Sequence, residues 1–245
     1  MVQALLLALL IMPFTAMTAT PAHASPPDQN PFLTWNMQGA TTVGVNLWTD
    51  YIPSVLREAG YPQIVMLQEV GAGPPAGAAQ LPNPPGTQGN SLVTYVEWHS
   101  SMRPSNWYML FLQTSNPTSP GGRVNTLIMS QSQITEAMVV NGHGRPAIGL
   151  QQGTDWYFSY HALSGGGTDA VHMLDAIGDS VEAAASPSSP PQRHDWTVGA
   201  DFTIPPEAEN GRGLSQHDDW PLINTPNGAC PATPCGEPRG LVEAA

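Results

Sequence analysis

The chain contains no lysine, and seven arginines are its only fully charged cations against 19 acidic residues. Charged residues make up 11% of the 245 residues and the formal net charge is −12, whereas about 25% of an average soluble protein is charged. Proteins that hold nucleic acid tightly usually present a basic face, so the composition argues against such a binder. A nuclease is still possible, because a bound cation and a few arginines can supply local positive charge. We expect weak, salt-sensitive substrate binding, or a basic partner that delivers the substrate.

Cysteine is nearly absent, and the two present are Cys230 and Cys235, which flank Pro-Ala-Thr-Pro. In a secreted chain this spacing allows a small local disulfide, and two free thiols in a tail are equally compatible with it. A zinc site is not expected, because neither the spacing nor a nearby histidine supports one.

Long apolar runs are confined to the N-terminus, where residues 1–24 have the layout of a cleaved secretion signal. Residues 5–11 are an unbroken apolar run, and Ala22-His23-Ala24 has small residues at both positions of a signal-peptidase site. No Lys or Arg precedes the run, although secretion signals usually begin with a positively charged region. The alternative to a cleaved signal is an uncleaved membrane anchor. The run is short for a membrane span of about 20 residues. We therefore expect a secreted protein with no integral membrane association after cleavage.

The rest of the chain carries short apolar runs bounded by Gly, Pro, Asn and Ser, which predict strands at residues 32–35, 64–67, 108–112, 126–129, 156–160 and 196–198. Two amphipathic helices fit between them. The first is predicted over residues 46–59, where Pro53 bends or restarts it. The second is predicted over residues 168–184, where Thr168 can act as the cap and apolar residues recur at steps of three and four: Val171, Leu174, Ile177 and Val181. Strands that alternate with helices and then pair without them indicate an α/β fold with mixed sheets.

Three segments are predicted to have irregular structure. Residues 71–90 are rich in Gly, Pro and Ala and predict a long loop, and residues 186–191 form a Pro/Ser linker. No convincing strand follows Ile204, where seven prolines interrupt the chain. We therefore expect a signal at 1–24, one domain at 25–204 and an irregular Pro-rich tail at 205–245.

Four polar motifs follow predicted strands: Thr34-Trp35-Asn36, Leu67-Gln68-Glu69, Tyr160-His161-Ala162 and Ala200-Asp201-Phe202. If the strand ends meet at one sheet edge, an amide, two carboxylates and an imidazole converge there. A hard cation held by few carboxylates keeps open positions for water and phosphate, and histidine exchanges protons near neutral pH. Taken alone, each of these residue types more often has a structural role or none. An asparagine such as Asn36 commonly forms a turn, a carboxylate such as Glu69 is commonly solvated in a loop, and His161 is one of seven histidines.

Taken in order, these motifs resemble the endonuclease/exonuclease/phosphatase superfamily of DNase I-like phosphoesterases, and within it the B-subunit family of cytolethal distending toxins. The resemblance runs from about Phe32 to Phe202 and is also carried by Met102-Arg103-Pro104, Gly122-Arg123-Val124-Asn125, Arg145-Pro146 and Gly166-Gly167-Thr168-Asp169. It implies a two-sheet β-sandwich flanked by helices, with the site at one rim.

The same resemblance implies roles for particular residues. Glu69 would be the chief ligand of Mg²⁺ or another divalent cation, with Asn36 and Asp201 beside it. His161 would donate a hydrogen bond or proton to the phosphate, and Asp201 could instead orient the attacking water. Substrate phosphates would be held by Arg103, Arg123, Arg145 and Thr203. Arginine suits that task because its guanidinium pairs with two phosphate oxygens at once.

The sequence departs from the family pattern in two places. Where the superfamily has Gly-Asp-Phe-Asn, this chain has Ala-Asp-Phe-Thr, and Thr203 lacks the paired donor and acceptor of an amide. The family also closes with an Asp-His pair on its last strand, and no such motif follows Phe202. His217-Asp218-Asp219 is the one candidate substitute, in reversed order within the tail. A truncated gene or a frameshift near Pro205 would explain the missing part, so the domain is expected to be incomplete at its C-terminus.

Three functions follow from these observations. The first is a secreted, metal-dependent deoxyribonuclease that resembles a toxin subunit, with DNA as substrate and delivery or binding subunits as partners. The second is a phosphatase of the same superfamily that acts on phosphoinositide head groups, a phosphorylated small molecule. The third is an inactive, truncated homologue.

Overall fold

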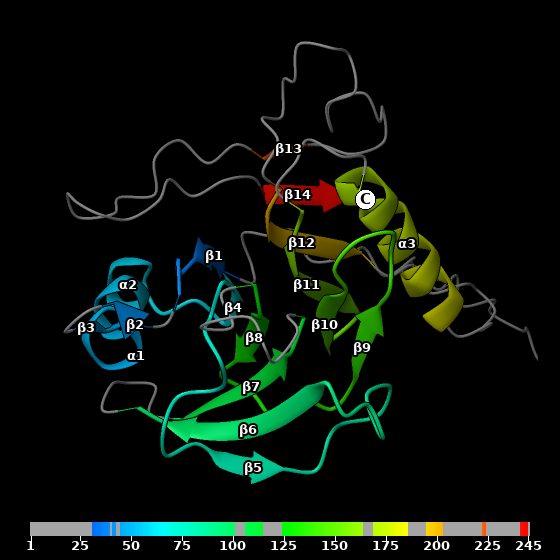
Figure 1. Cartoon of the computed structure of the whole chain (residues 1–245). Coiled ribbons are helices and arrows are strands. Elements are labelled where there is room, and N and C mark those ends of the chain that lie inside the picture. The colour runs from blue at the N-terminus through cyan, green and yellow to red at the C-terminus, as the bar shows by residue number, and fades with distance from the viewer. Residues whose placement is uncertain are drawn as a thin grey trace, which may run out of the picture.

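Two six-stranded sheets face each other in the computed structural model, and helices lie against their outer faces (Figure 1). The structure describes residues 31–39, 41–42, 45–100, 106–114, 124–163, 169–185, 195–202, 222–223 and 241–244. No helix in this described part of the chain is long and apolar enough to span a membrane.

The first sheet has the order β1-β4-β8-β7-β6-β5. In that order its strands are Phe32–Asn36, Ile64–Gln68, Thr126–Ser130, Asn106–Leu112, Val93–His99 and Ala79–Leu81. Strands β1 and β4 are parallel, and all other neighbours in this sheet are antiparallel.

The second sheet has the order β13-β14-β12-β11-β10-β9. Its strands, in that order, are Leu222–Ile223, Leu241–Ala244, Trp196–Asp201, Asp155–His161, Ala147–Gln152 and Ala137–Val140. Only β11 and β12 are parallel here. A separate two-stranded ribbon pairs β2 (Thr41–Thr42) with β3 (Val45–Asn46).

Helices connect the strands of both parallel pairs. Between β1 and β4 lie α1 (Leu47–Asp50) and α2 (Ile52–Glu58), and between β11 and β12 lies α3 (Asp169–Ala184). The side chain of Asn46 caps α1 by accepting from the backbone N–H of Trp48 at 3.0 Å. Pro53 stands in the first turn of α2, where its missing N–H costs no helical hydrogen bond. The chain therefore restarts as a second helix here, as the position of Pro53 predicts.

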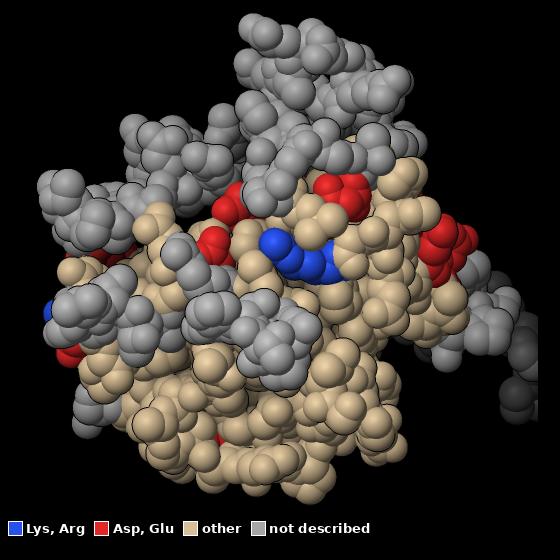
Figure 2. All heavy atoms as spheres, in the orientation of Figure 1, with Lys and Arg blue, Asp and Glu red and all other residues tan. Residues whose placement is uncertain are grey.

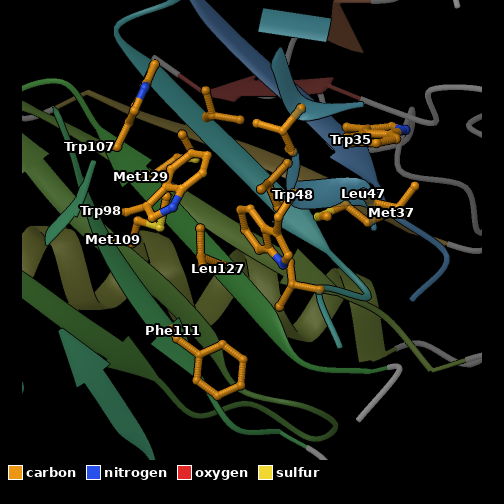
Figure 3. Close-up of a cluster of buried hydrophobic side chains, with 14 of the residues drawn as sticks. Trp35, Met37, Leu47, Trp48, Trp98, Trp107, Met109, Phe111, Leu127 and Met129 are labelled. Carbon is orange, nitrogen blue, oxygen red and sulfur yellow. The ribbon is translucent and has the colours of Figure 1, made fainter. Parts of the chain in front are cut away.

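Residues of alternating orientation along the strands build three apolar layers. Val65 and Leu67 of β4 face α1 and α2, whereas Ile64 and Met66 face the other sheet. Figure 3 shows the layer under α1 and α2, where Trp48 packs edge-on against Trp98 with ring centroids 5.9 Å apart. A third layer joins the outer face of the second sheet to α3, whose inward residues include those with the predicted helical spacing.

The predicted mixed sheets and the two helical regions are present. The six predicted strands are also present, and their bounds differ from the expected ones by at most three residues, the largest difference being at the end of β12. The sequence prediction missed β6, β9 and β10. Apolar runs identify a strand poorly when polar residues alternate with apolar ones, as in Val93–His99, or when Gly and Gln interrupt it, as in Ala147–Gln152. The predicted loop at 71–90 also contains the short edge strand β5.

The expectation that no strand follows Ile204 is wrong. Strand β14 pairs antiparallel with β12, and β13 pairs with β14. The segment Leu241–Ala244 is too short for its own pattern to predict a strand, and it becomes one by bonding to the edge of β12, which offers unpaired backbone groups. Whether residues 205–245 form a unit separate from the domain stays a prediction.

The close contact between β10 and β11 gives a testable prediction. A Cβ atom at Gly149 would lie 2.3 Å from Cε1 of Phe158, its partner across the strands, and the Phe158 ring is fully buried. We expect Gly149→Ala to lower the free energy of unfolding by about 1–3 kcal/mol, measured by urea denaturation.

The matched control is Gly73→Ala, because nothing lies within 4 Å of a Cβ atom at Gly73. Its free energy of unfolding should change by less than about 0.5 kcal/mol. Equal stabilities of the two variants would contradict the packing described between these strands.

Candidate active site

Four strands end at one rim of the sandwich and carry polar side chains there. Along β11 and β12, Trp156, Phe158, Trp196 and Val198 face α3, so alternation turns His161 and Asp201 toward the first sheet. The same alternation along β1 turns Asn36 toward the second sheet. Because both parallel pairs end at this rim, residues more than 160 positions apart in sequence meet there.

Glu69 reaches the same rim by a different route. It follows the last residue of β4, and continued alternation would turn it toward the helices. Its backbone has φ +52, in the left-handed region that non-glycine residues seldom adopt. This bends the chain as it leaves the strand. The turn is held by the N–H of Gly39, which donates to the carbonyl of Glu69 at 2.8 Å, and by Val70, which donates to the carbonyl of Asn125 at 3.1 Å.

The amide of Asn36 brings the two carboxylates together. Its Nδ2 donates to Oδ2 of Asp201 at 2.7 Å and lies 3.4 Å from Oε1 of Glu69. The backbone N–H of Gln38 donates to Oδ1 of Asn36 at 2.8 Å, which fixes the orientation of the amide. Asn36 therefore presents its nitrogen, and not its oxygen, to the acidic pair.

His161 completes the group from inside the sandwich. The residue is 5% exposed, and its Nε2 lies 3.8 Å from Oε1 of Glu69. Burial lowers the pKa of the imidazole, and the charge of Arg145 lowers it further, against the opposing effects of Asp201 and Glu69. His161 is therefore neutral near pH 7 and can donate or accept at Nε2. Its Nδ1 has no partner among the described residues.

The chain just after β11 is held from two sides. Nη1 of Arg145 donates to the carbonyl of Ala162 at 2.8 Å, and Oδ2 of Asp169 accepts from the N–H of Leu163 at 2.7 Å and from the hydroxyl of Tyr160 at 3.0 Å. Burial and then Asp169 raise the pKa of Tyr160, so its hydroxyl stays protonated and donates. These contacts fix the backbone that carries His161.

Arg145 therefore has a structural contact in addition to the phosphate contact that its sequence motif suggests. Burial lowers the pKa of its guanidinium, although the group remains charged because its ordinary pKa is above 12. In Figure 2, basic atoms lie between acidic ones on a face that is otherwise mostly uncharged. The nitrogens of Arg145 that do not bond the carbonyls can pair with a substrate phosphate.

The donor set fits a hard divalent cation. Glu69 and Asp201 offer carboxylate oxygens within reach of one amide, and Mg²⁺ is commonly bound through one or two carboxylates and several waters. In the described part of the chain no three His, Cys, Asp or Glu side chains gather as a metal cage.

Several predicted site residues lie outside the described residues: Arg103, Arg123, Thr203, the His217-Asp218-Asp219 run, the Cys230–Cys235 pair and the signal segment. The residues that the structure brings together are Asn36, Glu69, His161 and Asp201, with Arg145 beside them.

Sequence reasoning gave no role to three buried polar residues near the rim. Gln68 and Ser159 join the sheets beneath it. Asn125, which is 2% exposed, donates to the carbonyl of Gly71 and accepts from the N–H of Thr114. For Gln68 the available signal was a polar residue at the end of an otherwise apolar strand, Ile64–Gln68. For Ser159 it was a polar residue within a run of aromatic ones at residues 156–160.

The chain belongs to the endonuclease/exonuclease/phosphatase family, because the family's sequence profile matches residues 33–202. This range contains all four side chains that meet at the rim.

Among its relatives is the B subunit of the cytolethal distending toxin of Escherichia coli, 28% identical over 180 residues, which cover 71% of this chain and 64% of that relative. The chain thus matches less than two thirds of the length of that relative. A homolog of the same toxin component from Salmonella typhi is 25% identical over 193 residues, which cover 76% of this chain and 68% of the homolog.

Solved structures show the same architecture. Chains of the cytolethal distending toxins of Haemophilus ducreyi and Actinobacillus actinomycetemcomitans superpose with TM-scores of 0.66 and sequence identities of 26% and 27%. Each comparison covers 86% of this chain and 82% of the other. The fold is therefore the DNase I-like two-sheet sandwich, as the sequence motifs predicted.

The buried imidazole of His161 makes the free energy of unfolding depend on pH, and the direction of its pKa shift fixes the sign of that dependence. Because the pKa of His161 is lowered in the folded state, the unfolded chain binds more protons below its ordinary pKa of about 6.5. The free energy of unfolding therefore falls as pH drops below about 6.5 toward the folded-state pKa. His161→Gln removes this term, so its free energy of unfolding in metal-free buffer should depend less on pH than that of the wild type.

His172→Gln serves as the control, because His172 is exposed on α3. Urea unfolding of the three proteins at several pH values provides the measurement. If His161→Gln and the wild type show the same pH slope, His161 is not held neutral in the fold.

Proposed function

We propose that this protein is a secreted, divalent-cation-dependent phosphodiesterase of the DNase type, similar to the B subunits of cytolethal distending toxins. The observation that carries the proposal is the meeting of Asn36, Glu69, His161 and Asp201 at one rim. Family membership supports it, because the family's name covers nucleases and phosphatases and the matched residues include all four.

Each side chain has a role that its position supports. Glu69 and Asp201 would hold Mg²⁺, which when bound neutralises phosphate charge and lowers the pKa of a coordinated water. Asn36 keeps the two carboxylates in place through its amide nitrogen. The buried, neutral imidazole of His161 can donate Nε2–H to a phosphate oxygen. Asp201 can instead accept a hydrogen bond from the attacking water and so orient it.

Arg145 would contact a phosphate of the substrate. Its side chain is anchored by the carbonyls of His161 and Ala162, so a phosphate that it holds lies near the imidazole. With a net charge of −12 on the chain, long-range repulsion should keep the binding of a polyanionic substrate weak. Delivery or binding subunits, such as a multisubunit toxin would have, are the partners that we propose to overcome this weakness.

Nicking of supercoiled plasmid DNA tests the function. The wild type should nick DNA with Mg²⁺ present and lose this activity in EDTA. Glu69→Gln removes a cation ligand and His161→Ala removes the imidazole, so each should slow nicking by roughly 100- to 10,000-fold. The measurement is the initial rate of relaxation of supercoiled plasmid on agarose gels.

The matched control is Glu182→Gln, which removes an exposed carboxylate on α3, far along the helix from the site. It should keep the wild-type rate. Nicking by Glu69→Gln at that same rate would refute the assignment of the site.

A phosphatase acting on phosphoinositide head groups is the second candidate, because the few cations on the described surface suit a small anionic substrate better than a duplex. Release of inorganic phosphate from a phosphoinositide, without plasmid nicking and with the same dependence on Glu69, would favour it. A folded protein with neither activity would be an inactive homologue.

A further inference from the structure

The side chain of Gln68 connects the two sheets directly beneath the candidate site. It is the last residue of β4 and is 1% exposed. Its Nε2 lies 3.0 Å from the carbonyl oxygen of Gly199 in β12 and 3.2 Å from Oγ of Ser159 in β11. A carbonyl oxygen can only accept, so the amide nitrogen must face the second sheet.

A second hydrogen bond crosses the same gap in the opposite direction. The hydroxyl of Ser159 donates to the carbonyl of Leu67 at 3.0 Å, and so its oxygen is left to accept from Gln68. Nε2 of Gln68 also lies 3.4 Å from Oγ1 of Thr34 within its own sheet. Four strands, β1, β4, β11 and β12, thus share one polar network between the two sheets.

The two sheets approach each other closely at this level. A Cβ atom at Gly199 would lie 2.8 Å from both Cβ of Thr34 and Sδ of Met66. Real Cβ atoms do not approach that closely, so residue 199 must be glycine for the sheets to come this near. The hydrogen bonds of Gln68 span this narrow gap, and a larger separation would break them.

The bridge stands one strand period below the site. Thr34, Ser159 and Gly199 each precede a site residue by two positions, namely Asn36, His161 and Asp201, and Gln68 directly precedes Glu69. Residues two apart in a strand lie on the same face. The bridge therefore lies directly beneath Asn36, His161 and Asp201, and Gln68 is the immediate neighbour of Glu69 in the chain.

We propose that Gln68 is a positioning residue, which sets the distance between Asn36 and Glu69 on one sheet and His161 and Asp201 on the other. This inference rests on the proposed function of the site. Gln68 touches no reacting atom, and it acts by holding β4 at a fixed distance from β11 and β12. Because catalysis is steeply sensitive to misplacement of groups by about 1 Å, loss of the bridge should reduce the rate more than substrate binding.

Gln68→Met tests the proposal, because methionine has a similar length and no donor. With bis(p-nitrophenyl) phosphate and Mg²⁺ we expect kcat to fall by about 10- to 100-fold, whereas KM should change much less. The affinity for Mn²⁺, measured by titration calorimetry, should also fall, since its carboxylate ligands come from both sheets.

Gln131→Met is the matched control. Nε2 of Gln131 donates to the carbonyls of Tyr61 and Pro62 at 3.0 and 2.9 Å, at the opposite end of the first sheet. This variant also loses an amide bonded to backbone carbonyls, and its kcat and Mn²⁺ affinity should stay at the wild-type values. Equal kcat and Mn²⁺ affinity in the two variants overturn the inference.

Ser159→Ala keeps the proposal testable if Gln68→Met fails to fold. It removes one partner of Gln68 and one crossing bond, so kcat should fall in the same direction but less, and an unchanged kcat overturns the inference. If the wild type cleaves the ester and the Gln68→Met and Ser159→Ala variants behave like Gln131→Met, the role of Gln68 is contradicted and the proposed function is not. A wild type that neither cleaves the ester nor binds Mn²⁺ overturns the proposed function and this inference with it.

Discussion

The site depends on holding two like charges together at the edge of a sandwich. Like charges repel when they lie close together near a protein surface, so the carboxylates of Glu69 and Asp201, which both lie at the amide nitrogen of Asn36, need compensation. Asn36 supplies part of it by directing one amide nitrogen to both. The charge of Arg145 acts on the same pair, and a bound cation would supply the rest. A rim with this excess of negative charge is suited to binding a cation before an anionic substrate.

The sandwich provides this arrangement because its core fixes strands from both sheets at the same level. The parallel pairs β1–β4 and β11–β12 both end at the rim, and alternation turns Asn36, His161 and Asp201 inward. Glu69 joins them through a left-handed backbone turn, and not by alternation. Beneath them, the near contact at Gly199 and the bridge of Gln68 set how closely the two halves approach.

The sequence predicted the elements that have strong local patterns. Continuous apolar runs identified β4 and β8, and helical spacing identified α3. It missed β6, whose polar residues alternate with apolar ones, and β14, which exists only through pairing with β12. Motif order, more than any single residue, indicated Asn36, Glu69, His161 and Asp201. The roles of Gln68, Ser159 and Asp169 were not predictable, because they arise from contacts across the fold between residues distant in sequence.

On the function proposed above, the carboxylates of Glu69 and Asp201 bind one divalent cation between the two sheets. Anomalous diffraction from crystals soaked in Mn²⁺ tests this most directly. The proposed function predicts a single strong peak at the rim, about 2.0–2.3 Å from an oxygen of each carboxylate, which disappears in crystals of Glu69→Gln. A cleavage-competent protein with its Mn²⁺ peak elsewhere, or bound by only one of the two sheets, would contradict it.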